Sequence, residues 1–330
     1  MKPLVSIGVP LFNAENHITK LKDLWKQSYP QLEVIVSDNG SDDRTVEMVR
    51  KVLCGKKKVS FLTSAINHGL AWNFNRVFRA AKGKYFMWAS LDDRRNDNFV
   101  EKCVKEMEKH QDAALALPAV NVFIQNQPGC LYVVDVKEAS RHRGSLSRYA
   151  WVLDHFPAVG LYGFFRTSVL AQTKLMAPFP GGDLPLIDEL ALLGRIIHVS
   201  GTKFHYFGRS QWNCPRQDCR VFTGKMGKSL RGFAGVRISL EKVKRLQAAK
   251  VPCLEKCLLS FVLAGNLLKT NFLRAVKNAV LLLPGPLPRN WLLEKLYWLG
   301  FHNSTIRIKN RELFRTRVVF PVMGLKQNFP

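Results

Sequence analysis

The 330-residue sequence predicts an α/β fold, in which a mixed, mostly parallel sheet is flanked by helices and followed by a basic helical extension. Two observations carry this prediction. Apolar segments typical of buried strands alternate four times with amphipathic helical patterns in about the first 110 residues, as in a parallel sheet wound with helices. In addition, residues 195–330 hold 25 Lys or Arg and only 5 Asp or Glu, a net charge of +20.

The apolar periodicity assigns each element in order. Strands are expected at 4–9 (ended by Pro10), 32–36, 59–62 and 85–91, with further strands at 114–124 and 130–136. Helices are expected at 15–28, 45–53, 70–81 (with Gly83 as its C-cap) and 99–109, and from Pro185 to Leu193. The extension shows basic amphipathic patterns at 228–250 and 254–283. We therefore expect a catalytic domain over 1–212 and a mostly helical extension over 213–330.

Charge and cysteine content limit the functional classes. An excess of +20 over one region predicts an anionic partner, such as phosphate, nucleic acid or an anionic membrane face. The seven cysteines form no CxxC pair, and zinc binding at Cys214 and Cys219 is disfavoured. A strand begins directly after the first residues, so no signal peptide is expected, and no apolar run reaches a membrane-spanning length. We expect a cytoplasmic protein, either free or peripheral on the inner face of a membrane.

The acid pair Asp92-Asp93 directly follows the apolar segment 85–91. Ligands of open α/β sheets bind outside the carboxyl ends of the strands, and two carboxylates there suit a divalent cation that in turn binds phosphate. The alternative is that Asp92 only opens a turn.

Three other polar loops are expected along the same edge of the sheet. They comprise 10–13, 37–43 and 67–69, the last preceding a helix with Asn73, Asn75 and Arg76. Together they offer an aromatic face at Phe12, a carboxylate at Asp38 that could accept a base N–H, and amides for phosphate. Phe12 could instead be a core aromatic, and for Arg76 we favour a solvated helix face. The ordered set is the composition of a nucleotide-diphosphate site.

The sequence resembles the family 2 glycosyltransferases, which are inverting enzymes with the nucleotide-sugar-binding, Rossmann-like GT-A fold. The resemblance lies in VSIGVPLFN (5–13), VSDNGSDD (36–43), Asn67-x-Gly69 with Asn75, and AKGKYFMW (81–88) leading to Leu-Asp-Asp (91–93). It continues, more loosely, through GLYGFFR (160–166) and 183–195.

The resemblance implies a role for each matching residue. Phe12 would stack on the base, usually uracil, and Asp38 would hydrogen-bond it; Asp92 would be the main ligand of Mn²⁺ or Mg²⁺ and Asp93 would lie nearby. The nucleotide-binding set comprises Pro10, Phe12, Asn13, Asp38, Asn67, Gly69, Asn75, Asp92 and Asp93. Asp183 falls at the place of the catalytic base, with Glu189 and Asp188 as substitutes.

Chemistry supports an acid at position 183, because inverting transfer needs a carboxylate that takes the proton of the acceptor hydroxyl. Its alternative role is a helix N-cap.

Two positions depart from the family pattern. Ser90 stands where relatives often carry a second acid, and Arg209 stands near where they carry a histidine, with His205 out of register. We therefore expect Asp92, diphosphate and water to hold the metal, and Arg209 to neutralise the leaving group.

The predicted function is transfer of a sugar from a nucleotide-diphosphate donor, UDP-linked, to a glycan or lipid-linked acceptor in cell-surface glycan synthesis. The basic extension could lie on an anionic membrane through Leu254, Leu258, Phe261 and Val262, or could simply cover the catalytic domain. Two alternatives come from other classes. A nucleic-acid-binding protein on a degenerate glycosyltransferase scaffold is disfavoured, because the aromatics of the extension lie in apolar patterns. A nucleotidyltransferase is disfavoured because residues 10–13 are not a glycine-rich phosphate loop.

Overall fold

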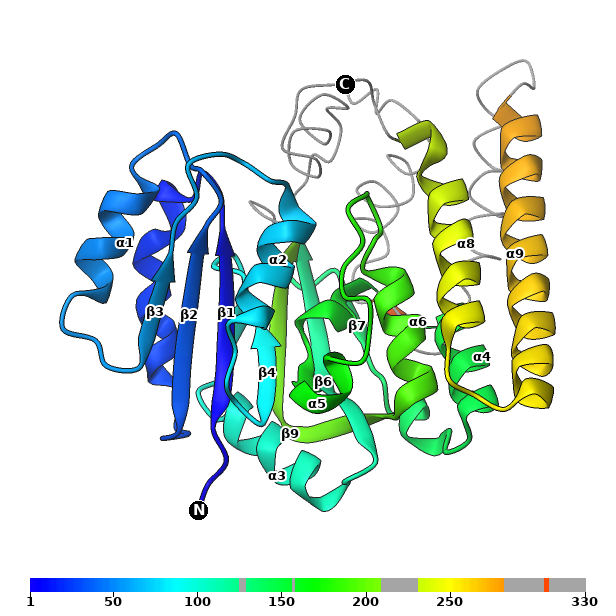
Figure 1. Ribbon diagram of the computed structural model, residues 1–330, viewed down its shortest axis with the longest axis horizontal. Coiled ribbons are helices and arrows are strands. Elements are labelled where there is room, and N and C mark those ends of the chain that lie inside the picture. The colour runs from blue at the N-terminus through cyan, green and yellow to red at the C-terminus, as the bar shows by residue number, and fades with distance from the viewer. Residues whose placement is uncertain (125–128, 156–157, 209–230, 282–305, 309–330) are drawn as a thin grey trace.

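The structure is a computed structural model that describes residues 1–124, 129–155, 158–208, 231–281 and 306–308. Figure 1 shows a twisted sheet with helices on both faces and a helical layer on one side. The N-terminal half contains β1 (Val5–Leu11), η1 (Glu15–Lys26), β2 (Leu32–Asp38), α1 (Thr45–Leu53), β3 (Val59–Leu62), α2 (Leu70–Arg79), β4 (Tyr85–Trp88), β5 (Arg94–Arg95), α3 (Phe99–Lys109) and β6 (Ala113–Ile124). The remainder contains β7 (Tyr132–Val134), η2 (Glu138–Arg141), α4 (Ser145–His155), η3 (Ala158–Tyr162), β8 (Phe164–Arg166), α5 (Thr167–Leu170), α6 (Leu184–Leu193), β9 (Arg195–Gly208), α8 (Arg231–Ala248), α9 (Cys253–Leu281) and β10 (Ile306–Ile308).

The predicted α/β fold with a mixed, mostly parallel sheet is confirmed. The strand order is β10-β7-β6-β8-β4-β1-β2-β3, and β9 pairs with both β5 and β6. Strands β1 to β4 are mutually parallel, whereas β8 is antiparallel to β4 and β6. The carboxyl ends of β1, β2 and β4 therefore share one edge of the sheet.

Three details of the sequence prediction differ from the structure. Strand β1 continues past Pro10 to Leu11, because β4 pairs with β1 only as far as Gly8 and the proline needs no donor on that side. The segment expected as an α-helix at 15–28 is the 3₁₀-helix η1, whose core-facing Ile18, Leu21 and Leu24 are spaced by three, the repeat of that helix. Helix α2 ends at Arg79, so Gly83 is not its C-cap; a Cβ there would lie 2.7 Å from the backbone nitrogen of Ser6.

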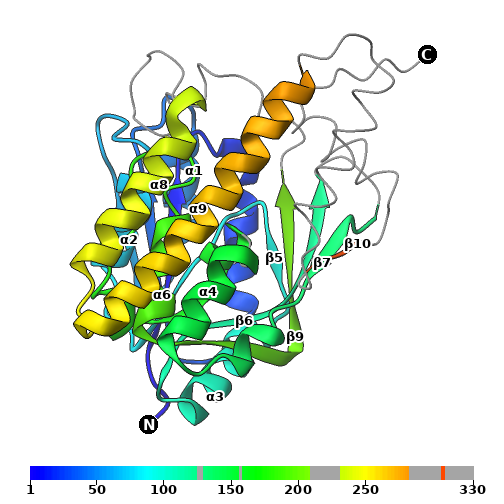
Figure 2. The same cartoon turned by 90° about the vertical axis from the view of Figure 1, so that its right-hand side faces the viewer.

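The basic extension packs on the α/β part through a small core of its own. Leu246 of α8 and Leu259 and Leu263 of α9 are buried against Tyr149 of α4 and Leu192 of α6. Figure 2 shows α8 and α9 side by side in front of α6 and α4, so they form the outermost helical layer. Strand β10, also from the extension, returns to the sheet and pairs antiparallel with β7. The expected domain boundary at residue 212 lies outside the described residues.

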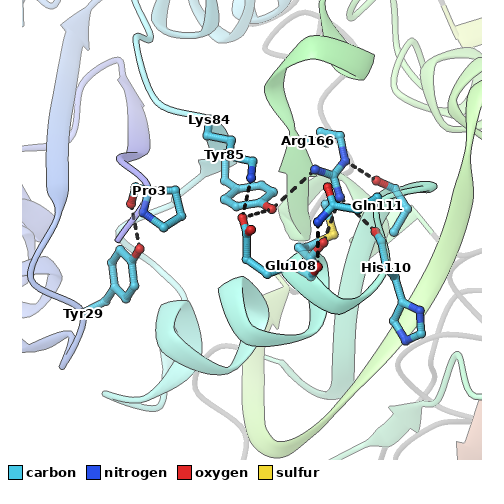
Figure 3. Close-up of polar contacts among 10 residues, drawn as sticks. Pro3, Tyr29, Lys84, Tyr85, Glu108, His110, Gln111 and Arg166 are labelled. Atoms are coloured by element: carbon cyan, nitrogen blue, oxygen red, sulfur yellow. Dashed lines mark hydrogen bonds and ion pairs between the residues drawn. The ribbon is translucent and has the colours of Figure 1, made fainter. Parts of the chain in front are cut away.

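The amino end of the sheet is held by a buried arginine (Figure 3). Arg166 at the end of β8 donates to the carbonyl oxygens of Ala113, Met107 and His110, each at 2.9 Å. Its remaining nitrogen lies 3.4 Å from the hydroxyl of Tyr85, which donates to Glu108. Nearby, the hydroxyl of Tyr29 donates to the carbonyl oxygen of Pro3. These contacts join β4, β6, β8 and α3.

None of the helices within the described part of the chain is both long enough and apolar enough to span a membrane. Five cysteines belong to that part, and no disulfide forms among them; Cys214 and Cys219 lie outside it.

Candidate active site

Asp93 is a buried carboxylate at the carboxyl end of β4. Its Oδ1 accepts the backbone N–H of Phe207 at 3.0 Å, whereas its Oδ2 has no hydrogen-bond partner among the described residues. Burial raises the pKa of Asp93 to about 7, an effect that the positive charge of Arg95 opposes. An inward-facing carboxylate oxygen without a partner is suited to a cation or a ligand hydroxyl.

The buried Arg95 interacts electrostatically with this carboxylate and was not singled out from the sequence. It donates to the carbonyl oxygen of Trp88 at 3.1 Å, and its guanidinium lies 4.4 Å from the ring centre of Phe204. Burial lowers its pKa, and the charge of Asp93 partly restores it. An arginine in a polar turn ordinarily faces water, so the sequence held no signal that β5 would pair with β9 and bury this side chain.

His17 of η1 contacts the other acid of the pair. Its Nε2 lies 3.3 Å from Oδ1 of Asp92, and its Nδ1 has no partner within the described ranges. Lys20, one 3₁₀ turn further along η1, lowers the pKa of Asp93. His17 and Lys20 therefore face the acid pair from the same side of η1. Neither could be found from the sequence, because their approach to the acids depends on how η1 packs beside the loop after β4.

The loops after β1 and β2 are locked together. Asn13, which has a positive φ of 48°, donates from its side chain to Asp42 at 2.6 Å and accepts the backbone N–H of Asp42 at 3.1 Å. Its own backbone N–H donates to Ser41 at 2.9 Å. Phe12, beside it, is half-buried and is not among the described residues that form the hydrophobic core. Stacking of its ring on a base stays a prediction.

Asp38 organises the second loop. Its carboxylate is almost fully buried and accepts the backbone N–H groups of Gly40 and Ser41 at 3.1 Å each, together with the hydroxyl of Ser41. Hydrogen bonding to a base stays a prediction for this residue, because most of its acceptor capacity serves its own turn.

The third loop packs closely on the second. Asn39 donates to Oδ1 of Asn67 at 2.9 Å and to the carbonyl oxygen of Gly69 at 3.1 Å. Gly40 has a positive φ of 74°, and a Cβ there would lie 2.4 Å from the backbone of Ile66, so only glycine allows this contact. Nδ2 of Asn67 is buried without a partner among the described residues. It is an N–H donor at the same edge of the sheet.

The polar residues of α2 join the loops rather than face solvent. Asn73 donates to the carbonyl oxygens of Leu11 and Ser37, at 3.0 and 3.1 Å. Asn75 exchanges two hydrogen bonds with the backbone of Met176, at 3.0 and 3.1 Å. Arg76 is partly exposed, so the solvated helix face favoured from the sequence stays a prediction; its guanidinium lies 4.9 Å from the ring centre of Trp72 and donates to the carbonyl oxygen of Thr63.

Asp183 occupies the N-cap position of α6, but its side chain makes no capping hydrogen bond. Burial raises its pKa to about 6. The preceding loop is fixed by the Asn75–Met176 hydrogen bonds and by contact of Gly181 with Ile238 of α8. A carboxylate with a pKa near neutrality on a fixed loop has the properties of a general base.

The two substitutes for Asp183 are engaged elsewhere. Glu189 accepts the backbone N–H of Lys174 at 3.0 Å and pairs with Arg245 of α8 at 2.9 Å. Asp188 is buried and pairs with Lys242 of α8 at 2.9 Å. Burial raises both pKa values and the α8 cations oppose it. Glu189 and Asp188 hold α6 against α8.

The structure brings three of the predicted acids together around one tyrosine. The pKa of the Tyr206 hydroxyl is raised first by burial and then by the negative charges of Asp93, Asp183 and Asp92. Tyr162 is likewise buried near Asp93 and Asp183. The acids that follow β4 therefore lie near the acid that begins α6. His205 pairs with Arg94 across β5 and β9, and Arg209 lies outside the described residues.

A divalent cation fits this acid pair through few protein ligands. No cluster of three His, Cys, Asp or Glu side chains that could hold a metal occurs in the part of the chain that the structure describes. The unpartnered Oδ2 of Asp93 and the adjacent carboxylate of Asp92 supply two suitable donors, and His17 lies against Asp92. Water and diphosphate would complete the coordination, as expected from the serine at position 90.

Comparison with known proteins relates the chain to glycosyltransferases. Residues 6–129 match the family described as "Glycosyl transferase family 2". An uncharacterized glycosyltransferase of Haemophilus influenzae is 27% identical over 130 residues, 39% of this chain and 40% of that protein. The chondroitin synthase of Pasteurella multocida is 34% identical over 113 residues, 34% of this chain and 12% of that protein. The aligned segments span less than half the length of these curated relatives.

Solved structures show the same fold over most of the chain. Residues 1–349 of S. aureus TarS give a TM-score of 0.57 at 19% identity, covering 88% of this chain and 78% of that one. The same fragment in complex with UDP-GlcNAc gives 0.55 at 18% identity over 99% of this chain and 94% of that one. A mannosyltransferase of Pyrobaculum calidifontis, in complex with GDP-Man and Mn²⁺, gives 0.51 at 18% identity over 98% of this chain and 86% of that one.

The fold is that of the GT-A glycosyltransferases. The segment that carries the acid pair and the loops of β1, β2 and α2 lies within the residues that match glycosyl transferase family 2.

Proposed function

We propose that the protein is an inverting glycosyltransferase that moves a sugar from a UDP-linked donor to the hydroxyl of a glycan or lipid-linked acceptor. The proposal rests on Asp92 and Asp93 after β4 and on Asp183 at the start of α6, whose charges all act on the Tyr206 hydroxyl. One pair of acids follows a central strand and the third begins a helix, so donor and acceptor groups can be held from two sides. The S. aureus relative solved with UDP-GlcNAc supports a UDP-linked donor.

The donor side is formed by the three joined loops. The Phe12 ring stacks on the base, and the loop shaped by Asn13 and Asp38 borders it. Asn67 offers its unpartnered Nδ2 as a donor, and Gly69 lets the backbone of the third loop approach the second. Asn75 acts on the acceptor side instead, because both its polar atoms hold the loop that precedes Asp183.

The transfer step follows from the position of Asp183. Its carboxylate accepts the proton of the acceptor hydroxyl while that oxygen bonds to the anomeric carbon, and the bond from this carbon to the diphosphate oxygen breaks. The products are an inverted glycoside and a nucleoside diphosphate. A pKa of about 6 keeps Asp183 ionised at neutral pH and still basic enough to assist.

Asp92, with Asp93 and His17 beside it, would hold Mn²⁺ or Mg²⁺. A bound divalent cation supplies positive charge that stabilises the departing diphosphate. Arg95 neutralises part of the charge of Asp93, which keeps two adjacent carboxylates compatible with burial. The cytoplasmic location expected from the sequence stays a prediction.

A screen of UDP-sugars with Mn²⁺, read out as UDP release in the presence of mixed glycan and lipid-linked acceptors, tests the proposal. Asp183→Asn should lower transfer by about 10²–10⁴-fold and leave UDP binding unchanged. Glu189→Gln is the matched control, since it changes a paired carboxylate on the same helix and should retain transfer. Retained transfer in Asp183→Asn, with loss in Glu189→Gln, would move the base to Glu189.

A further inference from the structure

The outer faces of α8 and α9 carry a stripe of exposed apolar side chains. Phe261, Leu254 and Leu268 are exposed to 76%, 75% and 71%. The stripe, called here the outer apolar stripe, comprises Val236, Leu240 and Val243 on α8 and Leu254, Leu258, Phe261 and Leu268 on α9. Single exposed apolar residues are common, but seven on two adjacent helices mark an interaction surface.

The stripe is a second apolar face, distinct from the one that folding uses. Each helix already buries an inner apolar face, through Leu246 on α8 and through Leu259 and Leu263 on α9. The exposed residues recur at intervals of three, four and seven, which places them on the opposite side of each helix. Figure 2 shows both helices in the outermost layer, so their outer faces point away from the sheet together.

The charges around the stripe are almost all positive. Residues 236–270 contain seven Lys or Arg and two acids. The acids are engaged internally, since Glu241 pairs with Arg245 and Glu255 accepts the hydroxyl of Ser145. Arg237, Lys244 and Lys250 are exposed. An apolar stripe flanked by cations is complementary to a surface that is anionic at its boundary and apolar beneath it.

We propose that the outer apolar stripe binds the surface of an anionic lipid bilayer. The apolar side chains enter the acyl boundary, and Arg237, Lys244 and Lys250 contact the anionic headgroups. A second copy of the chain would bring these like charges together and is less complementary. Nucleic acid would meet aliphatic side chains where it needs a basic groove with stacking aromatics.

Helix α8 connects this surface to the active site. Its inner face holds α6 through the Lys242–Asp188 and Arg245–Glu189 pairs, and its Ile238 contacts Gly181, two residues before Asp183. A bilayer bound to the outer face therefore lies one helix away from the base. Resting on the proposed transferase function, this arrangement assigns the acceptor to the class of lipid-linked hydroxyl compounds that are presented at a membrane surface.

Vesicle flotation of the full chain tests the inference. Phosphatidylglycerol–phosphatidylcholine vesicles should carry the protein at low salt, and pure phosphatidylcholine vesicles or high salt should reduce the bound fraction several-fold. The double variant Leu258→Glu/Phe261→Glu should reduce it at least tenfold. The variant Lys57→Gln/Lys105→Gln is the control, because it lowers the net charge equally at exposed positions outside the stripe.

Two results would overturn the inference. The first is a double variant that floats as the parent does, and the second is a parent that floats at neither salt concentration. A dimer that Leu258→Glu/Phe261→Glu dissociates, without lipid binding, would assign the stripe to a second copy. UDP-dependent thermal stabilisation, measured on the same samples, reports the nucleotide site separately. Loss of the UDP-dependent stabilisation would count against the transferase function, but not against membrane binding by the outer apolar stripe.

Discussion

At the amino end of the sheet, Arg166 is buried and its guanidinium donates to three carbonyl oxygens at 2.9 Å (Figure 3). At the carboxyl end, Asp93 and Asn67 each keep a buried polar atom without a partner among the described residues. Burial raises the pKa of Asp93 to about 7 and of Asp183 to about 6. Both ends hold buried polar side chains, yet every guanidinium nitrogen of Arg166 has a partner, whereas Oδ2 of Asp93 and Nδ2 of Asn67 have none among the described residues.

This difference separates the parts of the fold that stabilise it from those that await a ligand. Leaving a buried polar group unpaired costs about 1–3 kcal/mol, so such atoms persist where a ligand uses them. Arg166 is fully partnered within the protein, and its buried charge joins strands and a helix. Substitutions at the two ends should therefore change different properties of the protein.

The largest effect on folding is expected from Arg166→Met. The change leaves the carbonyl oxygens of Ala113, Met107 and His110 without their donor, and should lower the free energy of unfolding by about 3–5 kcal/mol. Urea denaturation measures it. Lys84→Met is the control, because that side chain is in an exposed ion pair and should change stability by less than about 1 kcal/mol. Equal losses in both variants would contradict the assigned role of Arg166.

Asp183→Asn should act in the opposite direction on stability. A folded-state pKa of about 6, above the ordinary 3.8, means that folding favours the protonated carboxyl. The parent therefore loses stability as the pH rises from about 4 to above 6, whereas the variant does not. Between pH 4 and pH 8 the free energy of unfolding of the variant should increase relative to that of the parent by on the order of 1–2 kcal/mol. Parallel stability curves for parent and variant would show that Asp183 is not buried as described.

The same carboxylate predicts the pH dependence of transfer. A base with a pKa of about 6 must be ionised, so kcat/KM should fall about tenfold per pH unit below 6 and level off above it. Initial rates between pH 4.5 and 8 measure this. Glu189→Gln should leave the acidic limb in place, because Glu189 is paired with Arg245. Loss of the acidic limb in Glu189→Gln would instead assign the titrating base to Glu189.

The smallest effect is expected from His17→Ala. Its Nε2 lies 3.3 Å from Asp92, so it contributes to the cation site without being its main ligand. The variant should weaken Mn²⁺ binding in the presence of UDP by about 3–10-fold, or about 1 kcal/mol, in titration calorimetry. Thr19→Ala, an exposed change on the same helix, is the control. Unchanged affinity in His17→Ala would remove the histidine from the site.

Much of the carboxyl end of the sheet could be predicted from the sequence, because a strand and the acids that directly follow it are local features of the chain. The alternation of elements, the edge shared by the loops and the place of Asp183 before α6 all followed from spacing. Arg95 could not be predicted, because its burial depends on β5 pairing with β9. The contact of His17 with Asp92 could not be predicted either, because it joins η1 to the distant loop after β4. The role of Asn75 likewise depends on a contact with Met176, 101 residues away.

The central claim is that the carboxyl end of the sheet binds a nucleoside diphosphate through a cation at Asp92. Thermal unfolding of the parent and of Asp92→Ala, with UDP and Mn²⁺ together and with each alone, tests it most directly. UDP with Mn²⁺ should raise the melting temperature of the parent by several degrees and leave that of Asp92→Ala unchanged. An equal rise in both proteins would contradict it.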